Sequence, residues 1–400
     1  MLLLENVSPT ALEIFGGAGF QVETMTQALA PAALGKKLAA GAFEVLGIRS
    51  KTRVPDSVLA EAPSLLAIGC FCIGTDQVEL GAANRRGVPV FNAPFSNTRS
   101  VAELMIAEII SLSRQLGDRT REVAGGTWKK VAAGCYEVRG KTLGIVGYGH
   151  IGRQLGVLAE GLGMRVFFHD HTPKLPMGNN TAVPTLRELL AMSDFVSLHV
   201  PDTKQTRNMI GAAELALMKE GSYLLNASRG TVVVIPALAA ALQSGHLAGA
   251  AVDVYPEEPE TSGDGFHTAL QGLPNVLLTP HIGGSTSEAQ AAIGREVSTV
   301  LTKFVGSGAT RGSVNFPNVE PQAQQDARRI LNVHRNVPGV LRDINKIVSD
   351  RQANIRSQVL ATDPDIGYLI MDIDQDAGDI SREVHQGIAS LPTSIRTRIL

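Results

Sequence analysis

Two polar residues in this chain follow apolar runs at positions where they could take part in a reaction. Arg229 carries a two-pronged guanidinium that can hold a carboxylate and polarise an adjacent carbonyl, although an isolated arginine is more often a surface residue. His281 precedes Gly283 and Gly284, which permit close approach of a ligand. A histidine titrates near neutral pH, so it suits a base that takes the proton of an alcohol during hydride transfer, and a neighbouring carboxylate would orient it.

A glycine-rich loop predicts the hydride acceptor. The spacing Gly147-x-Gly149-x-x-Gly152 follows an apolar run at 143–146 and precedes a helical pattern. The first glycine permits a tight turn, the second lets the backbone approach a pyrophosphate, and the third lets helix and strand pack closely. Such loops also occur without ligands, but Asp170 ends the next strand about 20 residues later, where a carboxylate binds ribose hydroxyls. Because that carboxylate repels a 2′-phosphate, we expect NAD and not NADP.

The composition excludes several other classes of function. The chain has 400 residues, 44% of them hydrophobic, and its formal net charge is −2. Near-neutral charge gives no electrostatic footprint for nucleic acid or a membrane surface. Neither a signal peptide nor a membrane span is predicted. Three cysteines cannot form a disulfide framework, and Cys70 and Cys72 favour buried thiols over a metal site. We expect a cytoplasmic protein without a metal.

The elements that would position these groups follow an α/β pattern. Strands are predicted at 45–50, 65–69 and 88–92, and then at 143–146, 165–168, 195–198, 222–226 and 276–279. Helical patterns between them imply parallel sheets with crossover helices. Long helices are predicted at 99–116, with Ser100 and Glu103 as a capping box, and at 285–308. A linker at 309–327 follows.

The last seventy residues have a different order of elements. The pattern predicts strand 329–334, helix 339–352, strands 354–361 and 367–373, helix 377–391 and strand 394–400. A βαββαβ order of this size is ferredoxin-like. Since the segment carries no catalytic groups of its own, we expect it to be a binding or assembly domain.

Several blocks of sequence resemble the D-isomer-specific 2-hydroxyacid dehydrogenases. They are GYGHIG at 147–152, NASRGTVV at 226–233, DVYPEEP at 253–259, TPHIGG at 279–284, AIGCFCIGT at 67–75 and FNAPFSNTRSVAE at 91–103. The resemblance covers essentially the whole chain. Within the family, the sequence is most similar to bacterial members that oxidise 3-phosphoglycerate with NAD and carry a terminal ACT domain.

The resemblance implies roles for individual residues. His281 would be the acid/base, Glu258 its partner and Arg229 the carboxylate anchor. The positions matching cofactor-binding residues are Gly147, Gly149, His150, Ile151, Gly152, Asp170, Ala227, Ser228, Arg229, Asp253, His281, Gly283 and Gly284. Those matching substrate-binding residues are Arg49, Ser50, Lys51 and Asn97, with Trp128 and Lys130 reaching a neighbouring subunit. Lys51 stands where relatives have arginine, so the charge remains but bidentate phosphate binding is lost.

The resemblance also implies an architecture and a regulator. Residues 1–97 and 285–327 would form a flavodoxin-like substrate-binding domain with a linker, and 98–284 an inserted Rossmann domain for NAD. Residues 328–400 would form an ACT domain that binds L-serine, the end product of the pathway that this reaction begins, in a homotetramer. His334, Asn336 and Asn354 match the serine-binding positions. Asp326 and Ala327 stand where a Gly-Gly hinge is expected, which would stiffen the connection and weaken serine's effect.

Two alternative functions remain at this stage. The same triad occurs in reductases of glyoxylate, hydroxypyruvate or 2-oxoglutarate, so only the phosphate-binding residues distinguish these enzymes from the first hypothesis. A non-catalytic NAD-sensing scaffold is the second alternative, and the complete triad and the amino-acid-sensing tail argue against it.

Overall fold

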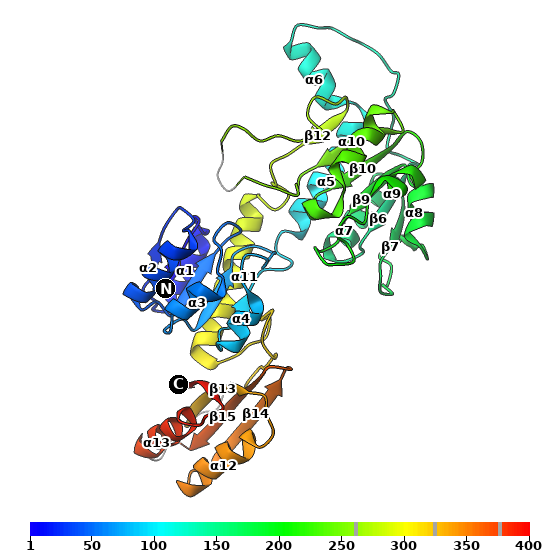
Figure 1. The fold of residues 1–400 in the computed structure, drawn as a ribbon. Helices are drawn as coiled ribbons and strands as arrows, with labels where there is room; N and C mark the ends of the chain where they lie inside the picture. The colour runs from blue at the N-terminus through cyan, green and yellow to red at the C-terminus, as the bar shows by residue number, and fades with distance from the viewer. Residues whose placement is uncertain (260–262, 323–325, 375–377) are drawn as a thin grey trace. The chain divides into compact units, whose positions relative to one another are not determined.

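The computed structural model describes residues 1–259, 263–322, 326–374 and 378–400 (Figure 1). These residues form two compact units, Met1–Ser96 with Gln290–Leu400, and Asn97–Ala289. Residues 323–325 of the predicted linker and residue 377, predicted to begin a helix, lie outside the described ranges. No described helix has the length and hydropathy needed to cross a membrane.

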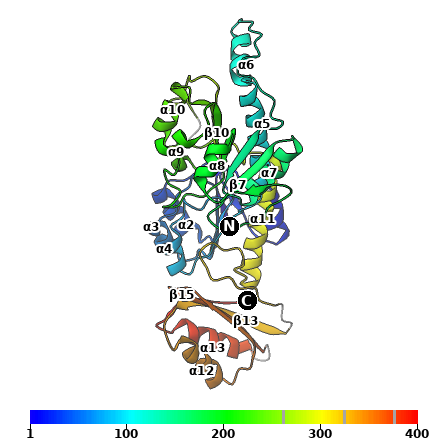
Figure 2. The ribbon, with the colours of Figure 1, turned by 90° about the vertical axis from the view of Figure 1, so that its right-hand side faces the viewer.

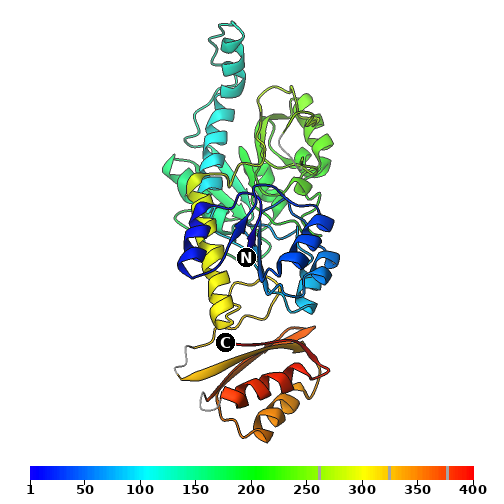
Figure 3. The same ribbon diagram turned by 90° about the vertical axis from the view of Figure 1, so that its left-hand side faces the viewer.

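The first unit begins with a parallel sheet whose strand order is β2-β1-β3-β4-β5, the flavodoxin-like order. Its strands are β1 (Leu2–Leu3), β2 (Glu23–Thr24), β3 (Val45–Ile48), β4 (Ala67–Cys70) and β5 (Val90–Phe91). One face packs against α1 (Pro9–Gly17) and α11 (Ser287–Ser307), which lie side by side in Figure 3. The other packs against α2 (Pro31–Gly41), α3 (Asp56–Glu61) and α4 (Leu80–Arg85).

The second unit has a parallel sheet of seven strands in the order β12-β11-β10-β9-β6-β7-β8. The strands are β6 (Thr142–Val146), β7 (Arg165–His169), β8 (Thr181–Ala182), β9 (Phe195–Leu198), β10 (Ser222–Asn226), β11 (Leu247–Val252) and β12 (Val276–Leu278). Because the order reverses between β6 and β9, the loops after these strands border a crevice typical of dinucleotide sites.

Helices cover both faces of this sheet because its buried strands are apolar on both sides (Figure 2). On β10, Leu225 packs toward α5 (Thr98–Ser113) and α7 (His150–Gly161). Its neighbour Leu224 packs toward the opposite face, covered by α8 (Leu186–Met192), α9 (Ala212–Leu217) and α10 (Ile235–Gln243). The Rossmann-type fold is therefore confirmed.

Residues from Ala327 onward form a third sheet, antiparallel, in the order β14-β15-β13-β16. Its elements are β13 (Ala327–Arg335), α12 (Val340–Asp350), β14 (Ile355–Thr362), β15 (Ile366–Asp374), α13 (Gly378–Ala389) and β16 (Ser394–Ile399). Both helices pack on one face, and Phe316 and Val319 pack on the other. This βαββαβ fold is ferredoxin-like, as predicted. Asp326, at the expected hinge, has a left-handed φ of 55°.

Some local predictions were wrong. The helix predicted at 99–116 ends at Ser113, and Gln115 takes a left-handed φ of 51° before α6 (Leu116–Ala124) begins. The predicted capping box does not form, because Ser100 hydrogen-bonds Thr286 and Glu103 pairs with Arg99. The strand expected at 65–69 lies at 67–70. Strands β1, β2, β8 and β11 were not predicted.

Candidate active site

The glycine loop lies directly after β6, at the reversal of strand order. Gly147 has a φ of 89°, and a Cβ there would lie 2.3 Å from the carbonyl oxygen of His199. A Cβ on Gly152 would lie 2.4 Å from the Gly147 carbonyl oxygen, whereas one on Gly149 would meet nothing within 4 Å. No described side chain caps the N-terminus of α7 at Gly149. This uncapped helix end with open space at the second glycine fits the pyrophosphate of a dinucleotide.

Asp170 follows β7, beside this loop. Its Oδ2 accepts the N–H of Tyr148 at 2.9 Å, and its Oδ1 accepts the N–H of Thr172 at 3.0 Å. Burial alone would raise the pKa of Asp170, but these hydrogen bonds and the charge of Lys174 outweigh burial and lower it. The carboxylate is therefore ionised at neutral pH and fits the ribose of NAD.

His281 and Glu258 form a hydrogen-bonded pair. The two residues lie in the loops after β12 and β11, with 2.7 Å between Nδ1 of His281 and Oε2 of Glu258. Glu258 Oε1 also accepts the N–H of Tyr255 at 3.0 Å, which fixes the carboxylate. His281 has a left-handed φ of 56°, an uncommon conformation for a non-glycine residue that tends to cluster at functional sites.

The pair tunes the pKa of both members. The hydrogen bond to Glu258, together with the charges of Glu258 and Asp253, raises the pKa of His281, although burial and the charge of Arg229 lower it. Burial would raise the pKa of Glu258, but the hydrogen bonds from His281 and Tyr255 and the charges of His281 and Arg229 lower it. Glu258 is thus a carboxylate that can stabilise a protonated His281.

Arg229 is positioned by its neighbours in the loop after β10. Asn226 accepts hydrogen bonds from the N–H and hydroxyl of Ser228 and donates to the Arg229 carbonyl oxygen at 3.1 Å. At Gly230 a Cβ would lie 1.9 Å from the carbonyl carbon of Tyr255. This close approach brings the Arg229 loop against the loop that carries Glu258. Arg229, Glu258 and His281 are therefore gathered at the carboxyl ends of β10, β11 and β12.

Asp253 connects the segments after β11 and β12. Its carboxylate accepts hydrogen bonds from Thr279 Oγ1 at 2.6 Å and from the N–H groups of Ile282 and Gly283 at 2.8 and 2.7 Å. A Cβ on the next residue, Gly284, would lie 2.5 Å from Nδ2 of Asn97, a predicted substrate-binding residue. Asn97 is buried, and its Oδ1 has no hydrogen-bond partner among the residues described.

Arg49, Ser50 and Lys51 follow β3 in the first unit, and sequence reasoning missed the residue that orders them. One carboxylate, that of Glu5, accepts the backbone N–H groups of Arg49, Lys51 and Thr52 at 3.2, 3.0 and 2.8 Å. From the other side, Gln77 donates to the Arg49 carbonyl oxygen at 2.7 Å. The only available signal was an acidic residue directly after the apolar run at the N-terminus.

Several predicted residues are not gathered with the others. Trp128 is 84% exposed and, like Lys130, lies in the segment after α6.

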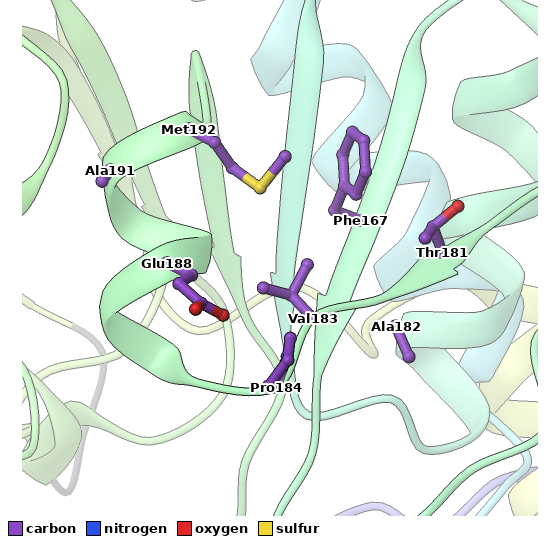
Figure 4. A pocket seen from close by; sticks show the side chains of 8 residues that line it. All are labelled: Phe167, Thr181, Ala182, Val183, Pro184, Glu188, Ala191 and Met192. Atoms are coloured by element: carbon purple, nitrogen blue, oxygen red, sulfur yellow. The ribbon is translucent and has the colours of Figure 1, made fainter.

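An open groove of about 500 Å³ between α8 and the edge of the seven-stranded sheet is lined by none of the predicted site residues (Figure 4). Among the residues that the structure describes, no group of three or more metal-ligating side chains could hold a metal ion.

The three predicted serine-binding residues lie at two ends of the antiparallel sheet. His334 pairs with Gly367 across the sheet, and Asn336 donates to the carbonyl oxygen of Asp363 nearby. Asn354 instead hydrogen-bonds Asp374, which pairs with Ala327 at the opposite end of β13. One chain therefore does not bring Asn354 to the other two residues.

Comparisons with known proteins agree with this geometry. Residues 106–283 match the D-isomer specific 2-hydroxyacid dehydrogenase, NAD binding domain, and residues 330–396 match the AHAS small subunit-like ACT domain. D-3-phosphoglycerate dehydrogenase from Dictyostelium discoideum is 56% identical over 400 residues, which is 100% of this chain and 97% of the relative. The enzyme of that name from Escherichia coli strain K12 is 51% identical with the same coverage.

The crystal structure of D-lactate dehydrogenase from Aquifex aeolicus with NAD and lactic acid superposes with a TM-score of 0.67. The alignment has 26% identity and covers 80% of this chain and 100% of that one. Sequence identity above 50% over the full length, the two domain matches and the grouping of the triad all indicate the same family. The chain belongs to the D-3-phosphoglycerate dehydrogenases, within the D-isomer-specific 2-hydroxyacid dehydrogenase family.

Proposed function

We propose that this protein oxidises 3-phospho-D-glycerate to 3-phosphohydroxypyruvate with NAD, the first step of L-serine biosynthesis. The observation that carries the proposal is the His281–Glu258 pair beside Arg229, in a chain that is similar over its full length to D-3-phosphoglycerate dehydrogenases. Residues 98–284 would bind the cofactor, residues 1–97 with 285–327 the substrate, and residues 328–400 an effector.

Each member of the triad would have its own part in the proposed reaction. NAD, when bound, supplies the hydride acceptor. Because Nδ1 of His281 is held by Glu258, Nε2 is the atom that takes the hydroxyl proton. Glu258 stabilises the resulting imidazolium, and Arg229 holds the substrate carboxylate and polarises the carbonyl that forms.

Arg49 should decide between phosphorylated and plain substrates. Replacing it with alanine removes a charged partner of the phosphate, and hydrogen bonds to charged groups contribute about 2 to 3 kcal/mol, or a loss of about a hundredfold in kcat/KM. We expect this loss for 3-phosphoglycerate and little change for an unphosphorylated 2-hydroxyacid, measured as NAD reduction.

Arg85→Ala is a control for the Arg49 experiment, because Arg85 is a basic residue of the same unit at the end of α4. An equal loss on both substrate types in Arg49→Ala would favour a broader 2-oxoacid reductase instead. If the wild-type protein reduced no NAD with any 2-hydroxyacid in this assay, the result would favour the non-catalytic NAD-sensing scaffold.

We further propose a homotetramer inhibited by L-serine. The exposed Trp128 and Lys130 would reach a neighbouring subunit, and ACT sheets paired side by side would bring Asn354 of one copy to His334 and Asn336 of another. Cys70, Cys72 and Cys135 form no disulfide in the described part of the chain, which is compatible with a cytoplasmic location.

Serine binding should need both ends of the sheet. We expect Asn354→Ala to weaken L-serine binding about tenfold, since a hydrogen bond to a charged ligand is worth about 1.5 kcal/mol or more. Titration calorimetry measures this directly, with the rate of NAD reduction as a second readout. Undiminished serine binding in this variant, or none in the wild type, would contradict the effector proposal.

A further inference from the structure

Helix α5 carries a buried acidic residue that the triad does not use. Glu108 is 4% exposed, and neither of its carboxyl oxygens has a hydrogen-bond partner among the described residues. A buried ionised carboxylate without donors is very costly, so the group is retained in its neutral form. Burial, and next the negative charge of Asp253, raises the pKa of Glu108 to about 8.

The position of Glu108 relates it to the cofactor residues. Val101, Leu104 and Glu108 recur at helical spacing on α5, and a Cβ on Gly283 would lie 3.4 Å from Val101 and 3.9 Å from Leu104. This face of α5 therefore packs beneath the loop that Asp253 holds through Ile282 and Gly283. Glu108 is buried one helical turn further along this face, and the charge of Asp253 acts on it.

Asp253, directly after β11, is the charged group that shifts the pKa of Glu108. Tyr255 lies in the same loop, and its pKa is raised first by burial and then by the charges of Asp253, Glu258 and Glu108. Helices α6 and α7 and strands β10 and β12 also pack against α5. None of their titratable residues is among the groups that shift the pKa of Glu108; these residues are Asp118, Arg119, Arg121, Glu122, His150, Arg153, Glu160 and Tyr223. Among these titratable groups, Asp253 is therefore the one whose charge shifts the pKa of Glu108.

We propose that Glu108 is a positioning residue of the cofactor site, whose buried carboxyl releases its proton when the oxidised, cationic nicotinamide binds beside Asp253 and retains it when the neutral reduced form binds. The inference rests on the proposed function, in which hydride transfer at His281 requires the nicotinamide beside the loop that Asp253 holds. A cation added to this layer offsets the repulsion between the two carboxylates, so it favours ionised Glu108. The neutral reduced ring provides no such offset.

This exchange makes the two cofactor forms respond differently to pH. Each unit by which the cation lowers the pKa of Glu108 tightens NAD⁺ binding about tenfold on going from the protonated to the ionised enzyme. Binding of NADH should change little over the same range. Alkaline conditions would then favour the oxidised cofactor, in the direction that alcohol oxidation requires.

The test compares wild type with Glu108→Gln, an isostere of the neutral acid, and with Glu103→Gln, a control on the exposed side of the same helix. NAD⁺ and NADH are titrated by calorimetry without substrate, between pH 7 and pH 9, in buffers of different ionisation enthalpy. His281 also loses a proton more readily beside a cation, but that contribution is common to all three proteins.

We expect wild type and Glu103→Gln to release more protons on binding NAD⁺ than Glu108→Gln does, with no such difference for NADH. The wild-type dissociation constant for NAD⁺ should tighten with pH by about tenfold relative to Glu108→Gln. Equal proton release in all three proteins would overturn this inference while leaving the cofactor placement standing. Failure of the wild type to bind NAD⁺ would overturn both.

The pH dependence of Tm in the cofactor-free protein tests whether Glu108 is protonated before the cofactor binds. Because the folded-state pKa of Glu108 is raised above that of the unfolded chain, its contribution to stability is present at acid pH and is lost as pH rises to about 8. Wild type should therefore lose Tm relative to Glu108→Gln between about pH 5 and pH 8, and then run parallel to it. A constant difference across this range would contradict a protonated Glu108.

Discussion

Replacing His281 with asparagine is expected to lower kcat by about a thousandfold, the range that a general base contributes. Asparagine keeps a polar side chain that can tolerate the left-handed φ of 56° but cannot take a proton. The loss should appear in kcat measured by NAD reduction at saturating NAD⁺ and substrate. A variant that retains a tenth or more of the wild-type rate would rule out His281 as the base.

The rate should also depend on pH, because Glu258 raises the pKa of His281. Oxidation requires the neutral imidazole, and Glu258 raises the pKa of His281, so kcat/KM should rise with pH through an apparent pKa above the ordinary histidine value. Glu258→Gln removes the negative charge that causes this shift. Its rate should be lower at every pH, and the acidic limb of its profile should move to lower pH. If the acidic limb stays at the same pH in Glu258→Gln, the pH dependence does not arise from the His281–Glu258 pair.

Replacing Gly230 with alanine is expected to have the largest effect on the fold of the second unit. The new Cβ would lie 1.9 Å from the carbonyl carbon of Tyr255 and 2.0 Å from its oxygen. Both atoms belong to the backbone, so a rotamer change cannot relieve the clash. Separating the two loops should cost about 3 kcal/mol, which lowers Tm by roughly 10 °C in a unit of this size. It also moves Arg229 away from Glu258, so kcat should fall.

Gly161→Ala is the matched control for the Gly230 substitution. Gly161 is the last residue of α7, and a Cβ there would meet nothing within 4 Å. Its Tm and kcat should stay at wild-type values or rise slightly, because alanine favours a helix. If both variants melt together with wild type in a thermal scan, the contact between the Arg229 loop and Tyr255 does not constrain the site.

The sequence predicted elements well where one pattern decides them. Buried parallel strands are continuous apolar runs, so β6, β9 and β10 were placed within a residue of their bounds. Strands β1, β2 and β8 have two residues each and were missed, whereas β5, equally short, was predicted as part of the longer run at 88–92. The break between α5 and α6 depends on the left-handed φ of Gln115, a residue with no preference for that conformation, so no sequence signal predicted it.

The same distinction applies to the candidate site. Glycine-flanked polar residues after strands predicted Arg229 and His281, because a parallel sheet brings its strand ends to one edge. Glu5 acts on backbone groups more than forty residues away, and the buried Glu108 is affected by the charge of Asp253, which is also distant in the sequence. Such roles arise from tertiary packing, so local spacing does not reveal them.

Steady-state NAD reduction by the purified protein shows whether it prefers a phosphorylated substrate. The assay compares 3-phosphoglycerate with glycerate, lactate and 2-hydroxyglutarate. We expect kcat/KM for 3-phosphoglycerate to exceed that for each unphosphorylated acid by about a hundredfold, the contribution of charged contacts to one phosphate. Equal or greater kcat/KM for an unphosphorylated acid would contradict it.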